Sequence, residues 1–150
     1  MHIETKYSGT VNVAPEEVYH FEHGLPAFED EQRFVLMPFK EGTPFYILQS
    51  VETPELAFVM VNPFHFFADY QVEIPESTIT QLNITQQQDA AIFSIVTIQE
   101  PFQKSTANLQ GPVVLNVAER QGKQILLNDT SYGRKHHIFP QEEAAGQEGR

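Results

Sequence analysis

Cysteine and tryptophan are absent from this chain of 150 residues. Without cysteine it forms no disulfide, holds no thiolate-bound metal and offers no cysteine nucleophile, which is compatible with a reducing compartment. No apolar run approaches the roughly 20 residues that span a bilayer, and the start MHIETKYSGTV lacks the basic and apolar regions of a secretory signal. We therefore expect a soluble, cytoplasmic protein that does not enter a membrane.

Basic residues are also scarce. Nine Lys and Arg stand against 20 Asp and Glu, which gives a formal net charge of -11. Nucleic acids and anionic lipids are bound mainly through Lys and Arg that neutralise phosphates, so direct binding to either is disfavoured. The acidic surface either keeps the domain dispersed or serves a basic protein partner.

The length fits a single domain, because a chain of this size buries roughly 70% of its unfolded surface and needs no disulfide cross-links to fold. Residues 1–139 form this predicted domain. The remainder, PQEEAAGQEGR at 140–150, has no large apolar residue. Such a segment buries too little apolar surface to offset the conformational entropy lost on ordering, so we expect a disordered tail.

The pattern is mainly that of β-strands: short segments of β-branched and aromatic residues separated by Gly, Pro and Asn. We expect a single-domain, small antiparallel β-barrel-like fold of about ten strands. The runs LAFVMV at 56–61 and AIFSIVTI at 91–98 predict central strands buried on both faces. The predicted strands are 3–7, 10–13, 18–21, 34–39, 45–51, 56–61, 71–74, 91–98, 113–118 and 124–127.

One or two short helices are expected beside the strands. The segment PESTITQL at 75–82 is the best candidate, because Pro75 suits a helix start, Glu76 the first turn, and Ile79 and Leu82 share a face. Pro15 to Glu17 predicts a further short helical turn.

Metal ligation has weak support. His20 and His23 point to opposite faces of a predicted strand and match no standard metal site. The pair His136-His137 lies in a local basic patch that reads equally well as a solvated end. We predict no metal and no cofactor.

The sequence contains no recognisable set of catalytic residues either. The chain contains no G-x-S-x-G turn, and Gly122-Lys123 lacks the flanking residues of a P-loop. Acidic runs at 16–17, 29–31 and 142–143 lie in polar stretches, where we expect exposed carboxylates without a catalytic pKa shift. No catalytic residue is predicted.

The stretch STANLQGPVVLN at 105–116 reads as a turn before a strand. Asn108 favours an Asx-turn, Gly111 permits a positive φ, and Pro112 suits a strand start. Gln121-Gly122 then predicts the tight connection of a hairpin between 113–118 and 124–127.

Aromatic residues are unusually dense in NPFHFFADY at 62–70. Phe64, Phe66 and Phe67 either cover the open end of a barrel or form a patch that docks a protein partner. Both interpretations stay open at this point.

Several motifs together resemble the FliW family of flagellar assembly factors. They occur in the family's order and cover most of the predicted domain: FEHGLPAFED (21–30), FYILQSVETPELAFVMVNPF (45–64), DYQVEIP (69–75), TANLQGPVVLN (106–116) and GKQILLNDTSYGRKHHI (122–138). One departure is Ala27, where the family pattern Gly-Leu-Pro-Gly-Phe-Glu has its second glycine. A positive φ is therefore less expected at this position.

The resemblance implies a β-barrel-like protein without enzymatic activity that binds two partners alternately. One is the RNA-binding translational repressor CsrA, whose repression of flagellin mRNA is thereby relieved; the other is unassembled flagellin, which captures the factor and frees CsrA. The repressor is inhibited either by RNA mimicry or by docking elsewhere, and the family favours the second. For the docking surface we predict apolar anchors with a charged rim: Phe64, Phe66, Phe67, Glu73, Glu76 and Asp129.

A second hypothesis is a small barrel that binds a small-molecule ligand or acts as a simple hydrolase. The crowded apolar strands argue against it, because they predict a filled interior.

Overall fold

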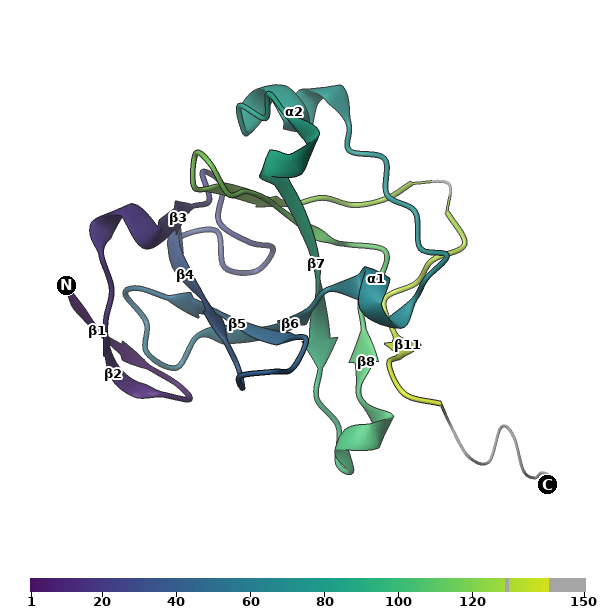
Figure 1. The fold of residues 1–150 in the computed structure, drawn as a ribbon, viewed down its shortest axis with the longest axis horizontal. Coiled ribbons are helices and arrows are strands. Elements are labelled where there is room, and N and C mark those ends of the chain that lie inside the picture. Colours follow the sequence, from purple (N-terminus) through teal and green to yellow (C-terminus); the bar gives the residue numbers. More distant parts are fainter. Residues whose placement is uncertain (129, 141–150) are drawn as a thin grey trace.

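Strand β7 (Ala90–Thr97) closes the sheet into a barrel, because it pairs with the strands at both ends of the row β6-β5-β4-β3-β10-β9. The computed structural model describes residues 1–128 and 130–140, and Figure 1 shows the barrel with its accessory elements. The predicted mainly β, barrel-like architecture is confirmed. The strands are β1 (His2–Thr5), β2 (Gly9–Asn12), β3 (Val18–His20), β4 (Arg33–Pro38), β5 (Phe45–Ser50), β6 (Ala57–Val61), β7 (Ala90–Thr97), β8 (Thr106–Ala107), β9 (Val113–Asn116), β10 (Gln121–Gln124) and β11 (His136–His137).

Short helices lie outside the barrel wall. The α-helices are α1 (Pro63–Phe66) and α2 (Glu76–Gln81), and the 3-10 turns are η1 (Pro15–Glu17), η2 (Gln87–Asp89) and η3 (Phe102–Lys104). The helix predicted after Pro75 is therefore confirmed as α2, with Pro75 as its N-cap, and the turn predicted at Pro15 as η1. None of the described helices is long and apolar enough to cross a membrane.

The barrel interior is filled by large side chains, because each barrel strand points alternate residues inward. Fully buried residues from β3, β4, β5, β6 and β9 meet there, and Phe21 and Phe34 pack edge to face at 5.2 Å. Among the described residues, this filled interior argues against the ligand-binding hypothesis. The inner cluster is Tyr19, Phe21, Leu25, Phe34, Leu48, Met60, Phe93, Val113 and Leu115.

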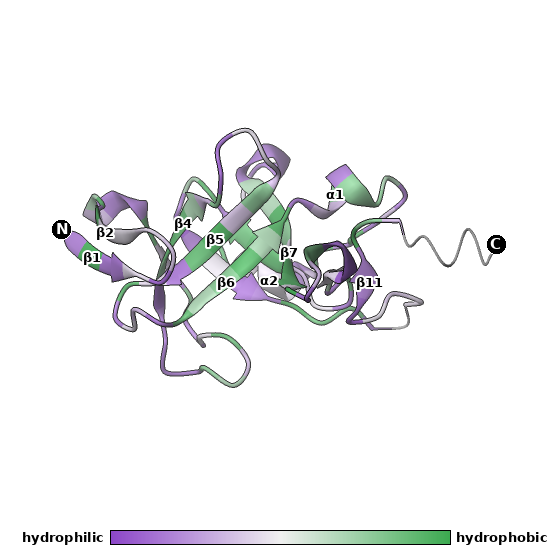
Figure 2. Ribbon diagram, turned by 90° about the horizontal axis from the view of Figure 1, so that it is seen from below, coloured by the Kyte–Doolittle hydropathy of each residue, from purple (hydrophilic) through white to green (hydrophobic). Residues whose placement is uncertain are grey.

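Outer faces of the barrel strands are covered as well. Ile3 of β1 and Val13, directly after β2, pack on Val35 of β4. Phe66 and Phe67 pack over Ile47 and the outer cluster of β5 and β6. This double burial explains the continuous apolar runs in the sequence, and Figure 2 shows β5, β6 and β7 as the apolar centre.

Two predicted strands were wrong or displaced. Residues 71–74 form no strand, and the strand predicted at 124–127 lies at 121–124 instead. The hairpin itself exists, since β9 pairs antiparallel with β10, but its turn occupies 117–120. Gly122 is therefore a strand residue; an added Cβ would lie 2.4 Å from Cζ of Phe21, so glycine provides room for that ring.

The topology departs from a purely antiparallel barrel at one place. β10 pairs with β3 in parallel, through Gln121 and His20. Strands β8 and β11 extend the sheet beyond β7 and were not predicted, because strands of two residues are too short to show periodicity.

Backbone conformation also corrects two expectations. Ala27 does adopt a positive φ, of 72°, although its side chain disfavours that region. Gly111 does not; an added Cβ would instead lie 3.0 Å from Nε2 of Gln124, so close approach explains the glycine.

Candidate protein-docking surface

The segment that follows β6 carries five of the six predicted docking residues. Asn62 caps α1, since its Oδ1 accepts a hydrogen bond from the backbone N–H of Phe64 at 2.9 Å, and Pro63 occupies the first helical position. Phe66 of this short helix packs against the outer cluster of β5 and β6, whereas Phe64 is exposed. Asp129, the sixth predicted residue, lies outside the described residues.

The three predicted phenylalanines differ in exposure. Phe64 is 42% exposed, with its ring 5.6 Å from that of Tyr70. Phe66 and Phe67 are half-buried against the outer cluster, and the Phe66 ring lies 5.9 Å from that of Phe45. Phe64 therefore offers the most accessible ring, while the other two mainly cover the outer face of β5 and β6. Their docking role stays a prediction.

Two tyrosines fix the chain between α1 and α2. The buried Tyr70 hydroxyl donates to the carbonyl of Leu109 at 2.7 Å, and its ring packs edge to face on Tyr132 at 4.8 Å. The Tyr132 hydroxyl accepts from the N–H of Gln71 at 3.2 Å and donates to the carbonyl of Asp69 at 3.3 Å. Burial raises the pKa of Tyr70, so its hydroxyl stays protonated as the donor.

A surface groove of about 720 Å³ begins where these tyrosines hold the chain. Its described lining contains a single charged side chain, the exposed carboxylate of Glu73. Glu76 is also exposed, in the first turn of α2, where a negative charge suits the helix dipole. The residues that define this docking groove are Gln71, Val72, Glu73, Pro75, Leu126, Leu127, Asn128 and Thr130.

Leu126 is a functional candidate that sequence reasoning missed. It lines the docking groove and is 57% exposed, more than any other large hydrophobic side chain of the described residues. The run Ile125-Leu126-Leu127 carried no signal for this exposure, because consecutive apolar residues also occur in strands that are covered on both faces.

The loop at 105–112 proves structural. Asn108 forms the predicted Asx-turn, its Oδ1 accepting from the N–H groups of Gln110 at 3.0 Å and Gly111 at 2.9 Å. The Ser105 hydroxyl oxygen accepts a hydrogen bond from the N–H of Gln99 at 2.9 Å, and this bond holds a turn. These contacts account for Ser105 and Asn108 without chemistry, whereas the buried hydroxyl of Thr106 has no hydrogen-bond partner among the described residues.

Histidines and carboxylates form no metal site within the part of the chain that the structure describes, where no group of three or more ligating side chains gathers. His20 and His23 are exposed, and Nε2 of His136 accepts from the N–H of Gly133 at 2.7 Å.

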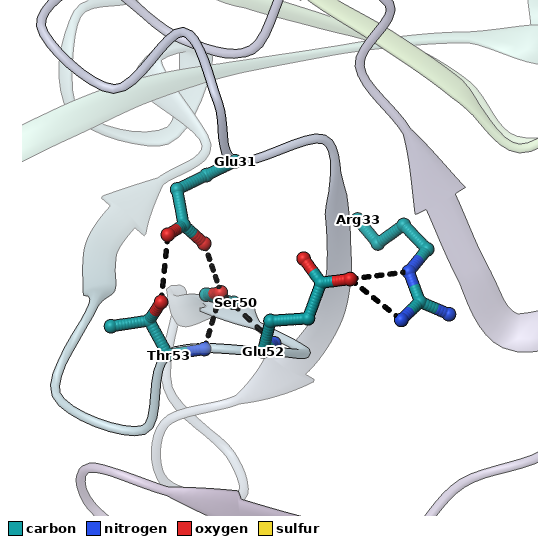
Figure 3. Close-up of polar contacts among 5 residues, drawn as sticks. All are labelled: Glu31, Arg33, Ser50, Glu52 and Thr53. Carbon is teal, nitrogen blue, oxygen red and sulfur yellow. Dashed lines mark hydrogen bonds and ion pairs between the residues drawn. The ribbon is translucent and has the colours of Figure 1, made fainter.

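One carboxylate of the acidic run 29–31 departs from expectation. Glu31 is half-buried and accepts hydrogen bonds from the hydroxyls of Ser50 at 2.6 Å and Thr53 at 2.7 Å, which lower its pKa (Figure 3). The Ser50 hydroxyl oxygen in turn accepts from the N–H of Thr53 at 3.0 Å. This network holds the turn after β5 against the loop before β4, beside the ion pair of Arg33 and Glu52 at 2.7 Å. The role of Glu31 here is structural.

Comparison with known proteins decides the family. The family model described as FliW protein matches residues 2–138 of this chain. The chain belongs to the FliW family. The resemblance inferred from the sequence motifs is thereby confirmed.

FliW relatives are similar over almost the whole chain. The flagellar assembly factor FliW of Geobacillus sp. (strain WCH70) is 48% identical over 144 residues, covering 96% of this chain and 99% of that protein. The flagellar assembly factor FliW of Bacillus subtilis (strain 168) is 45% identical over 138 residues, covering 92% of this chain and 96% of that protein. A crystal structure of the flagellar assembly factor FliW has 44% identity and a TM-score of 0.90, covering 95% of this chain and 99% of that one.

Proposed function

We propose that this FliW-family chain acts in flagellar assembly as a non-enzymatic, cytoplasmic binding protein. It binds a CsrA-type RNA-binding repressor and flagellin alternately. While it holds the repressor, flagellin mRNA is translated; when free flagellin captures it, the repressor returns to the mRNA. Family membership supports the flagellar role, and the two named partners come from the family resemblance.

One observation carries the docking part of the proposal: the docking groove bears the Glu73 carboxylate and the exposed Leu126 side chain. Exposed apolar area with a charged rim is the usual composition of a protein interface. The formal charge of -11 on the chain favours encounter with a basic repressor, since complementary charge raises association rates.

Docking beside the repressor's RNA-binding groove fits this surface better than RNA mimicry. An RNA mimic needs a row of negative charges in place of phosphates. The described lining of the docking groove has one carboxylate among amide, hydroxyl and aliphatic side chains. The proposal therefore includes a repressor contact with this groove that lies outside the repressor's RNA-binding surface.

Calorimetric titration tests the proposal. The full chain is titrated with a purified CsrA-type repressor and with purified flagellin, and each complex is then challenged with the other partner. We expect saturable binding to both, with displacement of one by the other. A complex that holds both partners together would overturn alternate binding, and no heat or complex with either would overturn the partner assignment.

A further inference from the structure

We propose that the docking groove accepts an extended basic peptide segment as an added β-strand. This inference rests on the proposed function, because it specifies how a protein partner is held at the same surface. The observation behind it is that 71–74 and 124–127 have the composition of strands, yet from Gln71 to Ile74 and beyond Gln124 neither segment belongs to a strand of the described sheet.

Both segments have the side-chain alternation of a strand. From 71 to 75 the residues alternate between exposed and half-buried, with Val72 and Ile74 directed to the core. From 125 to 128 the same alternation directs Ile125 and Leu127 inward. The inward residues of the two segments pack on one cluster, with Leu82 and Val114, so the segments share a support surface.

Backbone hydrogen bonds show which edge of the second segment is available. The N–H of Ile125 donates to the carbonyl of Pro112 at 2.9 Å, and the N–H of Leu127 donates to that of Gln110 at 2.8 Å. Successive amides of an extended chain point to opposite sides, so the N–H groups of Leu126 and Asn128 point away from the 110–112 segment. This arrangement gives the docking groove a strand edge, the feature to which peptides add in β-augmentation.

Charge defines the occupant. Glu73 is the single ionisable side chain in the described lining, and it is exposed. Glu73 and Leu126 both lie on the outward face, because their neighbours in each segment point to the shared cluster. A matching strand therefore directs Lys or Arg side chains to that face, where their aliphatic stems pack on Leu126, and aliphatic side chains toward the cluster. About five residues, at roughly 3.3 Å each, span the segment.

Nuclear magnetic resonance of the full chain tests the inference. The probe is the synthetic peptide acetyl-Lys-Val-Arg-Val-Lys-Val-amide, and its control is the same peptide with alternate backbone nitrogens methylated, which removes strand donors but keeps the side chains. We expect saturable shifts of the Leu126 and Asn128 amides and hydrogen exchange slowed about 10-fold or more at both. The methylated peptide should lose these effects.

Paired variants check the two walls. Glu73→Lys and Leu126→Lys should each weaken binding of the peptide about 5-fold or more. Their matched controls are Glu55→Lys and Ile98→Lys, which change an exposed carboxylate and a 45% exposed isoleucine outside the groove lining and should leave binding unchanged.

Each outcome decides the inference. Absence of shifts at millimolar peptide, shifts confined to another surface, or equal binding of the methylated peptide would overturn strand addition. The partner titration described above is independent of this measurement. A repressor or flagellin complex without peptide binding removes strand addition alone, whereas peptide binding without either complex removes the proposed partners alone.

Discussion

The Tyr70 hydroxyl lies 2.7 Å from the Leu109 carbonyl oxygen and joins the chain between α1 and α2 to the loop that precedes β9. Both residues are buried, at 4% and 1% exposure. This single bond spans 39 residues of sequence and positions the first wall of the docking groove, because Gln71 follows directly.

Tyr70→Phe should destabilise the fold by about 1–2 kcal/mol, because it keeps the ring but leaves a buried carbonyl without its donor. Urea unfolding measures this change. The matched control is Tyr7→Phe, at a 43% exposed ring, and should shift stability by less than about 0.5 kcal/mol. Equal effects at the two positions would show that the Leu109 contact is not stabilising.

Glu31→Gln should reduce stability at neutral pH and lose that effect in acid. Hydrogen bonds from Ser50 and Thr53 lower the pKa of Glu31 in the folded chain. A lowered pKa contributes stability above the unfolded value of 4.5, and the contribution is lost as pH falls through the folded pKa. Unfolding free energies of both proteins, measured from pH 7 down to pH 3, should therefore converge.

The control for this titration is Glu29→Gln, a carboxylate of the same acidic run on an exposed residue. Its stability difference from the unsubstituted chain should vary much less over the same range. A constant gap for Glu31→Gln would contradict the hydroxyl network as the source of the pH dependence.

Ala27→Gly should stabilise the chain by about 0.5–1 kcal/mol, because Ala27 has φ of 72° and glycine adopts this conformation without a Cβ penalty. Thermal unfolding measures the change. Ala14→Gly is the control: at φ of -82° the alanine is unstrained, and glycine should not stabilise. Loss of stability in Ala27→Gly would mean that flexibility of the unfolded chain outweighs the relieved strain.

Charge reversal at Glu73 and Glu76 together should slow association with a basic repressor about 3- to 10-fold at low salt and flatten its salt dependence. Stopped-flow kinetics at several salt concentrations measures both effects. Glu55→Lys reverses one charge on an exposed residue outside the groove lining. This variant measures how far the association rate falls from the change in net charge alone. An unchanged rate and salt dependence would show that these carboxylates do not steer the encounter.

Local patterns predicted most of the barrel, because β5, β6 and β7 combine β-branched and aromatic residues over five residues or more. They misplaced β10, since glycine ordinarily marks a turn, whereas Gly122 faces the Phe21 ring from another strand. The need for glycine at position 122 arises from tertiary packing, and the local periodicity of the sequence carries no information about such contacts.

The candidate site was predictable only as a region. The aromatic density at 62–70 identified the segment, but separating the exposed Phe64 from the half-buried Phe66 required the outer cluster on β5 and β6. Leu126, in the other wall of the groove, follows Glu73 by 53 residues in the sequence. No local signal joins it to Glu73, because the cluster beneath both segments forms only in the fold.

The three pairing partners of β7 also determine when the barrel can close during synthesis of the chain. Its first half pairs with β9, its middle with β6 and its last residues with β8, so the strand that closes the barrel precedes β9 in the chain. A ribosome that has released β3 to β7 has therefore released an open sheet with unpaired edges. Closure waits for β9 and β10 to emerge, and until then the nascent chain exposes edges that favour association with other chains.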